Sequence, residues 1–212
     1  MAAMNFSKGL FYWAPSLVCA CFWCFALAVF TDLLAPFGIT FFTAGLLVVI
    51  PALLMPFYRG LLCVFLSGCV VDASLPIPFE LTHSLSFWAA ERHVSLFGDI
   101  PADIPAFFGF VAGWMIFAYL VLRLLRSRIS AVNPLQWMVS AEIVNAIIFV
   151  FWATAMGWTR FDEPAYWGGL LLNLFFSALV MFIFGWWFFD LQLAAYRLCG
   201  IDIIREREGE CE

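Results

Sequence analysis

The sequence predicts an all-α polytopic membrane protein with six transmembrane helices. Hydrophobic residues make up 65% of the chain and charged residues only 12%, whereas a soluble domain is about 45–50% apolar and about 25% charged. A soluble domain of 212 residues could not bury so much apolar surface, and a disordered chain needs low hydrophobicity and high charge. Apolar runs of about 20 residues, long enough to cross a bilayer, recur along the chain. With loops, the length accommodates six of them.

The first half of the chain contains three predicted spans. The first covers residues 10–31, and we expect it to be uncleaved because its apolar run is longer than the core of a signal peptide. The second covers about residues 37–57, where Pro51 is expected to kink the helix. The third runs from Arg59 to about residue 75. Together they bring the chain to the outer side of the membrane.

A proline-rich break follows the third span. Pro76 and Pro78 must interrupt a helix, because each proline lacks a backbone donor and restricts the residue before it. The next stretch, residues 79–90, contains Glu80 and His83 and is too short and too polar for a confident span. We interpret it as an interfacial or partly inserted helix.

The second half contains the other three spans. They are predicted over residues 104–125, 135–158 and 164–189, and the loop between the last two is short, which favours an antiparallel pair. The expected organisation is a six-span domain over residues 1–197 and an acidic cytoplasmic tail over residues 198–212.

The distribution of basic residues predicts the orientation. With the N-terminus inside, the inner segments hold eight Lys and Arg residues and the outer segments hold only Arg92 and Arg160. Cytoplasmic loops of membrane proteins carry the excess of Lys and Arg. Both termini are therefore expected in the cytoplasm. The eight are Lys8, Arg59, Arg123, Arg126, Arg128, Arg197, Arg205 and Arg207.

Composition and motifs also limit the function. A net charge of −5 with a single lysine argues against nucleic acid as the main partner. The seven cysteines do not resemble a secreted disulfide scaffold, and His83 and His93 belong to no metal-ligand motif. No catalytic template or phosphate-binding glycine loop occurs. We expect a non-enzymatic protein without a cofactor or a metal.

Asp72 is the first candidate for a functional residue. It lies thirteen residues after Arg59, which at 1.5 Å per residue is about 20 Å into the membrane. A charged residue at this depth indicates an ion, ligand or partner contact beside the broken segment, together with Pro76, Pro78, Glu80 and His83. The alternative is a structural carboxylate that accepts backbone N–H groups at the helix break.

Three further polar residues lie within the last two spans. Glu142 and Asn145 are three residues apart and share a helix face. Asn145 and Asn173 are expected at similar depth, so a hydrogen bond between them would join the two spans. The alternative is a polar transport pathway that includes Glu142.

Gly109 and Gly113 form a G-x-x-x-G pattern in the fourth span. The pattern lets another backbone approach closely, either within the chain or on another protein.

Three segments carry a resemblance to a known family. Residues 65–76, FLSGCVVDASLP, contain a Gly-x-x-x-Asp segment that runs into a proline break. Residues 148–153, IFVFWA, and residues 161–173, with an aromatic residue, a short loop, Trp167 and then Asn173, follow in the last two spans. Over about half of the chain, this order resembles the rod shape-determining protein MreD family.

The resemblance implies a scaffold of the bacterial cell-wall elongation machinery in the inner membrane. Its partners would be an MreC-like bitopic protein and, indirectly, the MreB-like cytoskeleton and peptidoglycan synthases. Members of the family are thought to share the fold of the substrate-binding subunits of vitamin transporters. A small-molecule-binding transporter subunit is therefore the main alternative, with a membrane enzyme as a third.

Overall fold

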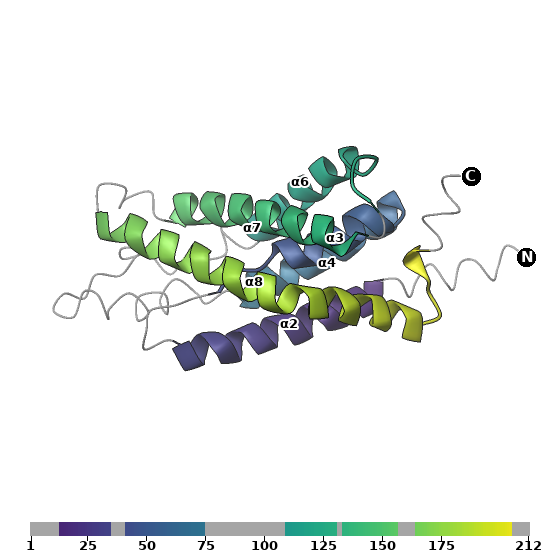
Figure 1. Ribbon diagram of the computed structural model, residues 1–212, viewed down its shortest axis with the longest axis horizontal. Helices are drawn as coiled ribbons and strands as arrows, with labels where there is room; N and C mark the ends of the chain where they lie inside the picture. The colour runs from purple at the N-terminus through teal and green to yellow at the C-terminus, as the bar shows by residue number, and fades with distance from the viewer. Residues whose placement is uncertain (1–12, 35–40, 75–108, 131–132, 157–163, 205–212) are drawn as a thin grey trace, which may run out of the picture.

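The structure is a computed structural model that describes residues 13–34, 41–74, 109–130, 133–156 and 164–204. Within these ranges the chain forms helices and no strand. Three helices contain segments long and apolar enough to cross a membrane, namely residues 13–31, 134–154 and 166–198, as a membrane protein requires. The helices are α2 (Trp13–Leu34), α3 (Gly45–Leu54), α4 (Phe57–Ser74), α6 (Phe110–Leu124), α7 (Pro134–Met156) and α8 (Pro164–Leu198) (Figure 1).

The short helix α3 lies at the centre of the bundle. All ten of its residues are buried, and it contacts α4, α6, α7 and α8. Residues 41–43, just before α3, are not helical. The prediction of one continuous helix over residues 37–57 is therefore wrong. Pro51 lies inside α3, which ends at Leu54; the expected kink stays a prediction.

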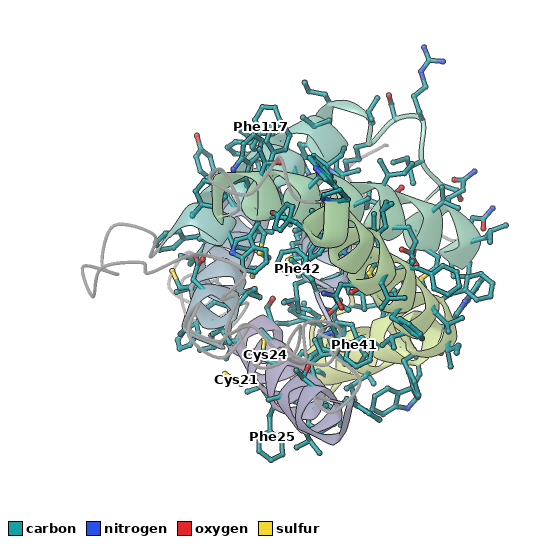
Figure 2. The ribbon with its side chains drawn as sticks, turned by 90° about the vertical axis from the view of Figure 1, so that its left-hand side faces the viewer. Cys21, Cys24, Phe25, Phe41, Phe42 and Phe117 are labelled. Atoms are coloured by element: carbon teal, nitrogen blue, oxygen red, sulfur yellow. The ribbon has the colours of Figure 1, made fainter. Side chains whose placement is uncertain are left out.

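The outer faces of the helices carry large apolar side chains. Phe25 on α2 and Phe117 on α6 are 70% and 54% exposed and point outward on opposite sides, whereas Phe42 lies near the centre of the ring of helices (Figure 2). This apolar exterior around an apolar core is the pattern that a lipid environment stabilises.

Helices α7 and α8 are neighbours, as their short connection predicts. The ring of Trp137 on α7 lies edge-on to Phe189 on α8, with 6.0 Å between the centroids. Towards the other end of α7, the hydroxyl of Tyr166 donates to the carbonyl of Ala153. These contacts confirm that the predicted fifth and sixth spans pack against each other.

Helix α8 is longer than a membrane span. Its 35 residues extend about 52 Å at 1.5 Å per residue, against a hydrocarbon core of about 30 Å. The helix ends where Gly200 adopts a φ of 74° and the N–H of Ile201 donates to the carbonyl of Tyr196, 3.0 Å away. Ile201 and Ile203 are buried, so the described start of the predicted tail packs back onto the bundle. The start of α2 and the end of α8 lie at the same end of the molecule (Figure 1).

Candidate functional site

The carboxylate of Asp72 binds the start of another helix. Its Oδ1 accepts the backbone N–H of Val111 and its Oδ2 accepts the backbone N–H of Ala112, both at 3.0 Å. The first N–H groups of a helix have no partner within that helix and favour a negative charge. Asp72 on α4 therefore caps α6, although the residues are 39 and 40 positions apart.

A glycine one turn earlier allows this contact. Gly68 and Asp72 are four residues apart, so they share a face of α4. A Cβ atom added at Gly68 would lie only 2.7 Å from the Cα of Ala112. Only a residue without a side chain allows α6 to come this close. Gly68 and Asp72, which form the Gly-x-x-x-Asp segment, thus make the surface of α4 on which the start of α6 packs.

A second group of contacts surrounds the non-helical residues before α3. The amide of Asn145 donates to the carbonyl of Phe42 at 2.7 Å and accepts the N–H of Gly45 at 3.3 Å. The N–H of Phe42 donates to the hydroxyl of Ser177 at 2.9 Å. Side chains from α7 and α8 therefore hold the main chain where α3 begins.

Further polar groups at the start of α3 are paired as well. Trp23 on α2 donates its indole N–H to the hydroxyl of Thr43, 2.8 Å away. The N–H groups of Leu46 and Leu47 donate to the carbonyls of Thr43 and Ala44. Irregular backbone at membrane depth is stable only when its polar groups are satisfied in this way. The donors that would bind an anionic ligand at a helix start are used internally.

Two arginines of the α6 segment hold the other end of α3. The guanidinium of Arg123 donates to the carbonyls of Ala52 and Met55, and Nε of Arg126 donates to the carbonyl of Leu53 at 2.9 Å. Pro56 has no N–H to offer, and the C-terminal carbonyls of a helix favour a cation. Both ends of α3 are thus stabilised by side chains from other helices.

Glu142 takes no part in these contacts. It lies on α7, is partly buried, and makes no hydrogen bond or ion pair with any residue in the described ranges. It neither supports α3 nor joins a second acidic or basic group there.

The other residues singled out from the sequence are distributed as follows. Asn173 is buried on α8, one turn before Ser177, and its direct hydrogen bond with Asn145 stays a prediction. Pro76, Pro78, Glu80 and His83 lie outside the described residues.

The G-x-x-x-G pair does not bring two helices together in the described part of the chain. Gly109 precedes α6 with a φ of 90°, a conformation that glycine adopts without strain, and Gly113 is exposed. A Cβ atom at either position would meet nothing within 4 Å. The close approach within the chain occurs at Gly68 instead, and contact of Gly113 with another protein stays a prediction.

The described ranges contain no candidate metal site. No three His, Cys, Asp or Glu residues there lie close enough to hold a metal ion. Cys21 and Cys24 have C-x-x-C spacing on α2 (labelled in Figure 2), where Cys21 is exposed and Cys24 is buried.

The comparisons with known proteins are negative. No family model, curated protein or solved structure matches this chain.

Ser177, Trp23 and Thr43 were not expected to act together. The available signal was the presence of hydroxyl and amide side chains in apolar segments, because an unpaired hydroxyl or amide is costly in hydrocarbon. Their shared partner, the non-helical backbone at residues 41–44, could not be anticipated while residues 37–57 were treated as one helix.

Proposed function

We propose that this protein is a non-enzymatic scaffold of the bacterial cell-wall elongation machinery. It spans the inner membrane six times, keeps both termini in the cytoplasm and binds a bitopic partner similar to MreC. Through that partner it acts on the MreB-like cytoskeleton and the peptidoglycan synthases. The proposal rests on the MreD-like segments and on the use that the bundle makes of its polar residues.

One observation favours a scaffold over a transporter subunit. Asp72, Asn145 and Ser177, which a polar pathway or ligand site could use, all bind backbone groups of α6 or of the chain before α3. A binding subunit would need polar groups directed at its ligand. Here their contacts stabilise a fixed shape, and the role of such a rigid bundle is to present a surface to other proteins.

Affinity purification in mild detergent tests the proposal. We expect the wild-type chain to recover a single-pass protein with a periplasmic coiled coil, and cells without the chain to lose their rod shape. The control is an affinity purification from the same membrane extract with an unrelated six-span protein as bait.

The alternative class makes a different prediction. Recovery of an ATPase pair, with binding of a small molecule by the purified chain, would contradict the scaffold and support a transporter subunit. Normal cell shape after depletion of the chain would contradict the proposal independently.

A further inference from the structure

Glu142 differs from Asp72, the other acidic residue predicted deep within a span. Asp72 has two backbone donors, whereas Glu142 has no partner among the described residues. It follows Pro134 by eight residues, which places it about 12 Å along α7. An ionisable side chain at this depth is costly unless it is paired. The position therefore calls for a donor or cation from outside the described bundle.

The surroundings of Glu142 face the exterior. Val139 and Ile143, on the same helix, are 52% and 55% exposed, while Glu142 itself is only partly covered. On the opposite face of α7, Ala141 and Asn145 are buried against α3. Glu142 thus lies at the border between the packed face of α7 and its apolar exposed face, where a second membrane helix can reach it.

We propose that Glu142 is the contact for a cationic side chain, Arg or Lys, on the transmembrane helix of a partner protein. Charge complementarity selects this occupant, because a lipid chain offers no donor to a carboxylate and an apolar helix would leave it unpaired. The exposed apolar side chains beside it pack against the same helix. The inference rests on the proposed scaffold function, since it names the surface through which a bitopic partner binds.

A designed peptide tests the contact without knowledge of the natural partner. The chain is reconstituted in lipid vesicles with a leucine-rich transmembrane peptide of about 20 residues that carries one arginine two turns from one end. Association is measured by energy transfer between fluorophores. We expect the arginine peptide to bind the wild-type chain at least about fivefold more tightly than an all-leucine peptide. Glu142→Leu should abolish this preference, and Glu142→Gln should reduce it.

A matched control separates position from charge. Asp190→Leu removes an exposed carboxylate from α8 and should leave the preference unchanged. Circular dichroism and elution volume establish that each variant is folded. Equal binding of the arginine peptide to wild-type and Glu142→Leu chains would overturn the inference, and so would equal binding of the two peptides to the wild type. Failure to recover a bitopic partner from cells would instead contradict the proposed function.

Discussion

At the scale of single residues, Asp72 shows how one carboxylate stabilises a helix that is distant in sequence. Its two oxygens accept the N–H groups of Val111 and Ala112. Hydrogen bonds to charged groups contribute about 1.5–3 kcal/mol, and a negative charge at a helix start adds to this. The residue that precedes α6, Gly109, has no side chain with which to cap it. The role therefore passes to a neighbouring helix.

This geometry predicts a graded response to substitution of Asp72. Asp72→Asn keeps one acceptor oxygen for one of the two N–H groups, whereas Asp72→Leu keeps none. We expect Asp72→Leu to lower the free energy of unfolding by about 1–3 kcal/mol and Asp72→Asn by less. Membrane abundance and cell-shape rescue, compared at equal expression, should follow the same order.

The contrary outcome is specific. If Asp72→Asn were normally abundant and assembled but inactive in cell-shape rescue, the ionised carboxylate would have a direct function beyond its bonds to α6.

At the scale of elements, α3 depends on its neighbours at both ends. Ten residues make fewer than three full turns, and such a short helix is marginal alone. Asn145 fixes the main chain before it, and Arg123 and Arg126 bind its last carbonyls. The helix forms because side chains from α7, from α6 and from the turn after α6 satisfy the polar groups that its own ends leave open.

Close packing of α4 on α6 predicts different effects at two glycines. Gly68→Ala would place a methyl group 2.7 Å from the Cα of Ala112, so the helices must separate. Overpacking of this kind costs about 1–3 kcal/mol. Gly113→Ala is the matched control, because its methyl group meets nothing within 4 Å. Thermal unfolding in mild detergent should show a lower midpoint for Gly68→Ala only; equal midpoints for both variants would contradict the packing.

The carbonyl end of α3 predicts a difference between two arginines. Arg123→Gln removes the guanidinium that binds Ala52 and Met55, while Arg128→Gln changes an exposed side chain. We expect a loss of about 1.5–3 kcal/mol for Arg123→Gln and within about 0.5 kcal/mol for Arg128→Gln. The free energy of unfolding of both variants is measured in the same detergent. Equal values for the two variants would contradict a specific role of Arg123 at the end of α3.

At the scale of the whole molecule, the long helices surround a short central one. Helix α3 contacts α4, α6, α7 and α8. The start of α2 and the end of α8 lie at one end of the bundle (Figure 1). An even number of crossings would produce this arrangement in a membrane.

The same arrangement predicts the topology of the chain. A reporter active only outside the inner membrane, fused after residue 212, should show no activity, because eight of ten Lys and Arg residues lie on the predicted inner side. A fusion after residue 160 should be active and serves as the positive control. Strong activity at residue 212 would exclude six spans with both ends inside.

The sequence by itself determined the class of this protein and the position of its long helices. Segments that face lipid must be apolar over the thickness of the bilayer. Composition and apolar runs therefore identify a helical membrane protein and place α2, α7 and α8. For Asp72 the sequence left two interpretations open, and one of them was a carboxylate that accepts backbone N–H groups.

Tertiary structure alone decided which groups these side chains serve. Asp72 binds the start of α6, and Asn145 binds the main chain before α3. The apolar run of residues 37–57 contained no signal that residues 41–43 are not helical. Local propensity cannot show this, because the free energy that stabilises such a segment comes from Asn145, Ser177 and Trp23, more than a hundred residues away in two of the three cases.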